Sequence, residues 1–289
     1  MMSPILSVFI SSLLWAIATQ IYAKMVQKLN VYRFNFYKSI IAFVCFFIAC
    51  VLSGNFYFPT AAMPYLLLSG FLGFTLADLF IFYSFSKNGP ARTLIFSSFS
   101  PTMIAVYSYF ILGKTLTSHK VMGLFFLLLC LVFLALERKN RGNFSIKIAL
   151  LAIIGINIEA VGVVFTKKAF MVMPDLSPFT ANLYRVGVAV LVLGILNSVR
   201  GIKFGIKDLD WKVKNRVLIS TFLGTFTALY FYLYAISNYD HPSIIAGIGS
   251  LAPIYASVYE HWRDKKRPNR YFIGAVASMV AGVIFLIFG

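Results

Sequence analysis

Long apolar runs constrain the fold of this chain more than any other feature of its sequence. Ten such runs, separated by charged residues or by Pro and Gly, occupy most of the 289 residues. A helix needs about 20 apolar residues to cross a bilayer, whereas barrel strands are about 10 residues long and alternate in polarity. The sequence therefore predicts an all-α integral membrane protein. Its ten transmembrane helices are expected at residues 3–23, 33–53, 63–86, 91–112, 120–136, 146–171, 178–199, 215–237, 242–262 and 270–288.

Composition argues against the main soluble classes of protein. The chain is 60% hydrophobic and 12% charged, whereas soluble domains are about 45–50% apolar and about 25% charged. The net charge of +17 would indicate nucleic acid in a soluble protein. Here nearly all Lys and Arg residues lie between the apolar runs, where basic residues anchor loops to anionic headgroups. We therefore expect the lipid bilayer, and no nucleic acid, as a partner.

The sequence carries no signal for catalysis or for a bound cofactor. Cys45, Cys50 and Cys130 lie inside apolar runs and lack metal-ligand spacing. No nucleotide-binding loop or catalytic dyad is present. We therefore expect a protein that is not an enzyme, with no catalytic residues, no metal and no cofactor. The first run lacks the basic flank and cleavage site of a signal peptide, and is expected to be retained as a helix.

The two halves of the chain, 1–141 and 142–289, are related as repeats of five helices each. Residues 35–38 (NFYK) match 182–185 (NLYR), 69–73 (SGFLG) match 220–224 (STFLG), and 100–101 (SP) match 252–253 (AP). Because each repeat has an odd number of helices, the second must insert upside-down relative to the first. Inverted repeats of this kind are typical of secondary transporters, whose solute site lies at the repeat interface near the membrane midplane.

The pattern of helices 3 to 5 resembles the drug/metabolite transporter superfamily, in particular its ten-helix, EamA-like family. The matching features are Gly73, Asp78 and Tyr83 in helix 3, then 89–92 (GPAR), Pro101, the turn 112–117 (LGKTLT) and Gly123. The chain departs from the family at Lys114, where Glu is usual. The resemblance implies a transporter of small solutes in which helices 1–4 and 6–9 line a central cavity.

Glu159 is the sharpest candidate for a functional residue. It lies near the middle of the sixth run, and ionisable residues at such depth are functional candidates by default. Gly155, Gly162 and Thr166 share its helical face, which suits close helix contact or a cavity wall. In helix 1 the repeat alignment predicts Ser12, Ala16, Thr19 and Ala23 as the equivalent face.

The stretch 159–167 is also similar to the first helix of the small multidrug resistance transporters. That resemblance implies a Glu that binds protons and cationic drugs in competition. We predict a coupling role for Glu159, against the alternative of a hydrogen-bonded structural carboxyl.

Three further charged residues within the predicted helices are candidates for the site. The repeat counterpart of Asp78 is Leu229. Asp78 either accepts a hydrogen bond from a substrate ammonium or has a structural role, such as a hydrogen bond to Thr75 or to a neighbouring helix. We favour the structural role. Lys38 and Arg185 occupy equivalent positions in helices 2 and 7. They either form a cationic pair for an anionic solute or, as we favour, snorkel to the headgroups.

Aromatic and proline residues complete the candidate set. Trp15 and Tyr232 are candidates to face a cavity, where an aromatic ring can bind a cation. The alternative is that they face lipid or the packed core. Pro101 and Pro253 each remove a backbone hydrogen bond and are expected to kink helices 4 and 9, as hinges for alternating access.

These features predict a secondary active transporter that works by alternating access, as an exporter and antiporter. Its solute is expected to be a small organic molecule such as an amino acid, amine or cationic metabolite. Transport is expected to be coupled to protons through Glu159. The alternative is an uncoupled facilitator or exchanger of amino-acid-like or anionic metabolites that uses Lys38 and Arg185. We expect a monomeric, multi-pass protein of the bacterial cytoplasmic (inner) membrane. The excess of Lys and Arg in the odd-numbered loops predicts that both termini lie outside, whereas the resemblance implies that they are cytoplasmic.

Overall fold

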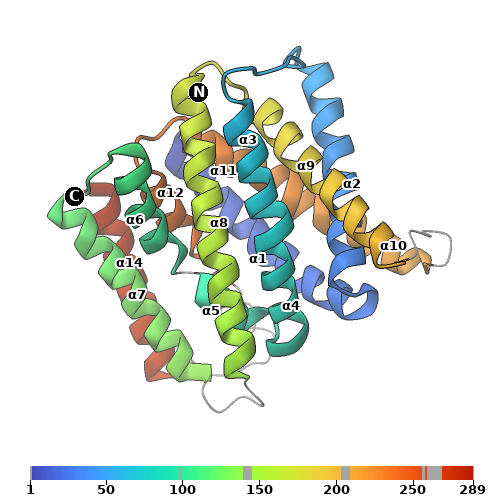
Figure 1. Cartoon of the computed structure of the whole chain (residues 1–289). Coiled ribbons are helices and arrows are strands. Elements are labelled where there is room, and N and C mark those ends of the chain that lie inside the picture. Colours follow the sequence, from blue (N-terminus) through green and yellow to red (C-terminus); the bar gives the residue numbers. More distant parts are fainter. Residues whose placement is uncertain are drawn as a thin grey trace.

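The computed structural model describes residues 2–97, 99–138, 145–202, 209–255, 258 and 269–288, and their regular structure is entirely helical (Figure 1). Eight helical spans of this part of the chain are long and apolar enough to cross a membrane. They are α1 (Pro4–Leu29), α2 (Val31–Leu52), α3–η1–α4 (Met63–Asn88), α7 (Ser118–Arg138), α8 (Ile146–Val172), α9 (Pro178–Val199), α10–η2–α11 (Trp211–Ser237) and α14 (Arg270–Phe288). The structure therefore confirms the predicted fold class.

The other two predicted spans, the fourth and the ninth, are broken helices. The fourth consists of α5 (Pro90–Ser97) and α6 (Ser100–Leu112). The ninth begins with α12 (Pro242–Gly249), and helical geometry resumes at Ala252. Each break lies just before a proline, because Pro101 and Pro253 sit in the first turn of the second segment, where a missing N–H costs nothing. Each proline was expected to kink a continuous helix. Instead, each helix is interrupted about one turn before its proline.

The third and eighth spans each contain a π-helical turn at equivalent positions of the two repeats. η1 (Phe71–Ala77) joins α3 (Met63–Gly70) to α4 (Asp78–Asn88). Likewise η2 (Phe222–Thr227) joins α10 (Trp211–Thr221) to α11 (Ala228–Ser237). A π turn leaves backbone carbonyls without their usual partners, and side chains from other helices supply donors. Trp15 Nε1 donates to the Gly224 carbonyl (2.8 Å) and Asn35 Nδ2 to the Phe74 carbonyl (2.9 Å).

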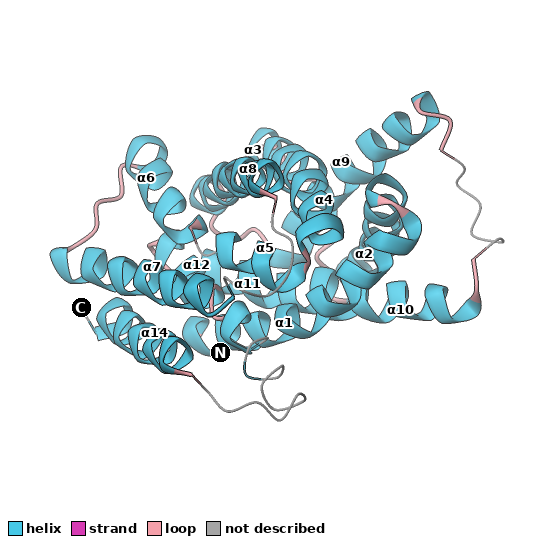
Figure 2. Cartoon of the chain, turned by 90° about the horizontal axis from the view of Figure 1, so that it is seen from below, coloured by secondary structure: helices cyan, strands magenta, loops and turns pink. Residues whose placement is uncertain are grey.

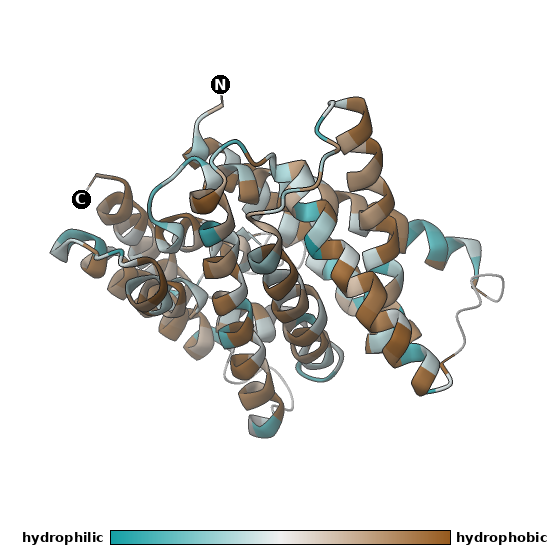
Figure 3. Ribbon diagram, turned by 45° about the horizontal axis from the view of Figure 1, so that its top comes forward, coloured by the Kyte–Doolittle hydropathy of each residue, from teal (hydrophilic) through white to brown (hydrophobic). Residues whose placement is uncertain are grey.

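The two halves interlock. The first helix of each half packs against the third span of the other, so that α1 contacts α10–η2–α11 and α8 contacts α3–η1–α4. The second helices, α2 and α9, pack together, as do the fifth, α7 and α14, which lie side by side at one edge of the molecule (Figure 2). Hydrophobic residues cover most of each long helix (Figure 3), and side chains such as Leu191 and Phe110 face outward, as lipid contact requires.

Small residues allow the interlocked spans to approach closely. A Cβ on Gly155 would lie 2.8 Å from Phe80 Cβ, and one on Gly162 would lie 3.3 Å from the Ser69 carbonyl. Thr166 Oγ1 is 2.6 Å from Ser69 Oγ. The face of α8 on either side of Glu159 is therefore a contact with the third span.

The matching contacts of α1 correct the predicted register between the first helices. Gly224 packs on Ala18 as Gly73 packs on Gly162. Because Ala18 is therefore equivalent to Gly162, the counterpart of Glu159 is Trp15, one residue from the Ala16 that the alignment predicted. A shift of one residue keeps the same helical spacing between the aligned positions, so the sequence alone does not reveal it.

Candidate functional site

A cavity of about 200 Å³ lies at the interface of the two repeats. Its lining residues come from spans 1–4 and 6–9, and none comes from the described parts of spans 5 and 10. This is the arrangement that the resemblance implied. The cavity runs from the middle of the spans toward the turn at Gly89, where Phe85 and Leu94 line it.

The structure brings most of the predicted site residues to this cavity. Those that line it are Trp15, Lys38, Asp78, Glu159, Arg185, Tyr232 and Pro253. Pro101 is not part of the lining, although its neighbour Ser100 is. Residues from both repeats thus meet in one cavity, where charged side chains lie among apolar ones.

Lys38 and Asp78 form an ion pair across spans 2 and 3. The Lys38 side chain is 3% exposed and its Nζ lies 4.7 Å from the centre of the Phe82 ring. The interpretation that Lys38 snorkels to the headgroups is therefore wrong. The predicted hydrogen bond between Asp78 and Thr75 is absent too, since Thr75 Oγ1 has no partner in the described part of the chain. Asp78 instead contacts a neighbouring helix, and the pair is buried and mutually neutralising.

Arg185 is also buried, at 4% exposure, so it does not snorkel either. Its Nε donates to Ser69 Oγ (2.9 Å) and its Nη1 to Asn182 Oδ1 (3.1 Å). The guanidinium carbon lies 4.9 Å from the centre of the Phe74 ring. Within the described residues no carboxylate lies at ion-pair distance from Arg185, so neutral groups alone hold this cation.

Glu159 faces the cavity from the middle of α8. Among the residues that the structure describes, none forms a hydrogen bond or an ion pair with its carboxylate. Asp78, Arg185 and Lys38 are the charged groups that act on it electrostatically. The cavity therefore holds two acidic and two basic side chains, of which only Lys38 and Asp78 are directly paired.

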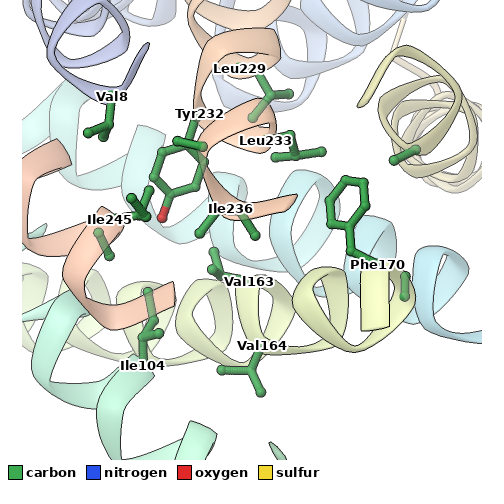
Figure 4. Close-up of a cluster of buried hydrophobic side chains, with 14 of the residues drawn as sticks. Val8, Ile104, Val163, Val164, Phe170, Leu229, Tyr232, Leu233, Ile236 and Ile245 are labelled. Atoms are coloured by element: carbon green, nitrogen blue, oxygen red, sulfur yellow. The ribbon is translucent and has the colours of Figure 1, made fainter. Parts of the chain in front are cut away.

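An aromatic pair forms another part of the wall. The Trp15 and Tyr232 rings have centroids 5.0 Å apart and an interplanar angle of 53°. Tyr232 sits among apolar side chains that include Val8, Leu229 and Ile245 (Figure 4). Both rings line the cavity.

Two lining residues, Tyr22 and Thr225, were not singled out in the sequence. Tyr22 Oη and Thr225 Oγ1 share a hydrogen bond of 2.6 Å between spans 1 and 8. Tyr22 follows Trp15 by seven residues and Thr19 by three, so the helical period of that face is the signal that could have found it.

At the end of the molecule opposite Gly89, two lysines contact the end of span 8 and the loop that follows it. Lys167 Nζ donates to the Ile236 carbonyl (3.0 Å) and to the Tyr239 carbonyl (2.7 Å). Lys114, the departure from the family pattern, lies 3.6 Å from Asp240 Oδ1 in the loop between spans 8 and 9. Lys114 thus makes an ion pair of its own with the second repeat.

Interlocked inverted repeats around a central cavity that contains charged side chains define a helical membrane protein of the transporter type. The sequence profile of the EamA-like transporter family matches residues 2–136 and 146–288. The chain therefore belongs to this family, whose members are membrane transporters of small solutes.

Other comparisons bear on the fold alone. A solved crystal structure described only as that of a "protein" superposes with a TM-score of 0.76 at 17% identity, covering 99% of this chain and 96% of that chain. No functionally curated protein matches the sequence.

Proposed function

We propose that this protein is a proton-coupled secondary transporter that carries a small organic solute through the central cavity. The observation that carries the proposal is the Glu159 carboxylate, which faces the cavity at mid-span without a hydrogen bond or ion pair among the described residues. A charged carboxylate at this depth is costly unless it is protonated, paired or hydrated. A proton or a cationic group of the solute supplies the missing partner.

Competition between these two occupants provides the coupling. Each occupant neutralises Glu159, so the empty, charged state is the one disfavoured while the repeats move relative to each other. A proton entering from one side then exchanges for a solute leaving to that side, which makes the protein an antiporter and, with an inward proton gradient, an exporter.

The cavity dimensions favour a small solute. Its volume of about 200 Å³ is below the roughly 300–1,000 Å³ of pockets for drug-sized ligands. Trp15 and Tyr232 offer π-faces to an ammonium group. An amino acid, an amine or a small cationic metabolite matches both features.

The two broken helices support alternating access. Ser97 and Ser100 at the fourth-span break, and Gly249 and Ala252 at the ninth-span break, line the cavity. Discontinuous helices beside the solute site are typical of transporters with inverted repeats. We therefore assign hinge roles to Pro101 and Pro253, with repeats at 1–141 and 142–289, in a monomer of the bacterial cytoplasmic membrane.

The test is solute flux into proteoliposomes with and without an imposed pH gradient. Labelled amino acids and amines serve as the solutes, and Glu159→Gln is compared with the wild type and with Asp175→Asn, an exposed loop control. The proposal requires that the gradient accelerate flux in the wild type and the control but not in Glu159→Gln. Equal gradient-driven flux in all three proteins contradicts it.

A second candidate is an uncoupled facilitator or exchanger of amino-acid-like or anionic metabolites. The observation in its favour is that the Arg185 guanidinium has no carboxylate partner in the described part of the chain. Lys38, in contrast, is occupied by Asp78. Flux that is independent of the pH gradient in the wild type would favour this candidate.

A further inference from the structure

The pseudo-symmetry of the two repeats is broken beside its two buried cations. Lys38 and Arg185 are repeat counterparts, and both line the cavity. Asp78, the partner of Lys38, has Leu229 as its own counterpart, and Leu229 lines the cavity as well. One repeat thus contains a complete ion pair, whereas the other contains the cation and a leucine in place of the acid.

The free donor of Arg185 lies on the cavity side. Nε and Nη1 are used by Ser69 and Asn182, whereas Nη2 donates to no described residue. Nη2 lies 3.9 Å from the position that a Cβ on Gly73 would occupy. Because Gly73 has no side chain and itself lines the cavity, it leaves open the space between this nitrogen and a solute.

The balance of charges in the cavity also favours an anionic ligand at Arg185. Lys38 and Asp78 cancel, and a protonated Glu159 adds no charge, so Arg185 leaves the cavity with one uncompensated positive charge. A buried cation without a counter-ion is unfavourable. A guanidinium is the side chain best suited to bind a carboxylate through directed, charge-assisted hydrogen bonds.

We propose that Arg185 is a subsite for the carboxylate, or an equivalent anionic group, of the transported solute, and that Leu229 determines this specificity by leaving Arg185 without an acidic partner. The inference rests on the proposed transport function and narrows its substrate class. Solutes with an anionic group, including zwitterions, bind at this subsite, whereas plain amines lack the group that Arg185 recognises.

The experiment uses acetate as the probe and acetamide as its neutral control, with the full-length purified protein at constant ionic strength. A ligand that binds only the folded state raises the unfolding midpoint, and the rise grows with the logarithm of the ligand concentration above the dissociation constant. Acetate is expected to raise the midpoint of the wild type, and acetamide is not. Acetate affinity should fall at least about tenfold in Arg185→Gln, because a hydrogen-bonded charge contact is lost.

Two substitutions at one position test the role of Leu229. Leu229→Asp restores a carboxylate at the repeat counterpart of Asp78 in the cavity wall and should abolish the acetate effect, whereas Leu229→Asn, of nearly the same shape but neutral, should retain it. An acetate effect that persists in Leu229→Asp or in Arg185→Gln overturns the proposal, and so does its absence in the wild type. Because this assay involves no gradient, its failure leaves the coupling role of Glu159 untouched, and failure of the gradient test leaves the anion subsite untouched.

Discussion

Trp15 and Glu159 occupy equivalent places in the two inverted repeats and face the same cavity. The equivalence follows from the contacts three residues further along each helix, where Ala18 meets Gly224 and Gly162 meets Gly73. One repeat therefore presents an aromatic ring, bonded to the Gly224 carbonyl, where the other presents a carboxylate. A symmetric scaffold thus carries an asymmetric site, with an indole in one repeat and a carboxylate at the equivalent place in the other.

The buried pair of Lys38 and Asp78 is expected to be important for stability. Asp78→Asn leaves the Lys38 ammonium buried without a counter-ion, and removing one partner of a buried pair costs about 3–5 kcal/mol. Thermal unfolding in detergent micelles measures the loss. Replacing both residues together, as Lys38→Met with Asp78→Leu, should restore much of the stability. If Asp78→Asn unfolds at the wild-type temperature, the pair does not have this role.

Close packing between the third span and α9 depends on Gly70. A Cβ at this position would overlap the Arg185 backbone, so Gly70→Ala forces the helices apart. Overpacking of this kind destabilises by about 1–3 kcal/mol. Gly194→Ala is the matched control in α9, because its Cβ would meet Phe36 at an ordinary 3.5 Å. Equal unfolding temperatures for the two variants would contradict the close approach.

The loop between spans 8 and 9 should lose stability in mild acid through His241. Burial, followed by the positive charges of Lys120 and Lys114, holds the pKa of His241 below its usual 6.5. Since the folded state binds this proton more weakly than the unfolded state, the stability contribution is complete above about pH 6.5 and is lost as the pH falls below it.

Unfolding midpoints measured between about pH 5 and pH 8 check this sign. His241→Gln is expected to flatten the profile on its acidic side, because the variant has no proton to bind at that position. Identical profiles for the two proteins would show that His241 makes no contribution.

Loop charge predicts the orientation of the chain in the membrane. Basic residues concentrate in the odd-numbered loops, and positively charged loops are retained in the cytoplasm. A single cysteine at position 175 should therefore react with an impermeant maleimide in intact cells, whereas one at position 210 should not. Both tests require replacement of Cys45, Cys50 and Cys130. The reverse labelling pattern would place the loops as the family resemblance implies.

The sequence was sufficient to predict the helices and the charged residues of the cavity lining, for a physical reason. Apolar runs of bilayer length have one stable outcome, and charged residues within them are rare enough to stand out. Lys38, Asp78, Glu159 and Arg185 were all identified in this way. Their positions along the helices were therefore predictable before any contact was known.

The partners of these residues were not predictable. Lys38 pairs with Asp78, whereas Arg185 bonds to Ser69. These pairings depend on the rotation of each helix about its axis, which the sequence of an apolar segment does not specify. The π turns at Gly73 and Gly224 depend on donors from distant helices. Local helical propensity therefore does not predict the π turns.

Movement of protons driven by the solute is the most direct test of the coupling assigned to Glu159. A pH-sensitive dye is sealed inside proteoliposomes, and a transported amino acid or amine is added outside without any initial pH gradient. The account predicts that wild-type protein alkalinises the lumen in proportion to solute influx, because an antiporter exchanges entering solute for leaving protons. Glu159→Gln should move solute, if at all, with no change in pH. A proton signal of wild-type size in Glu159→Gln would contradict it.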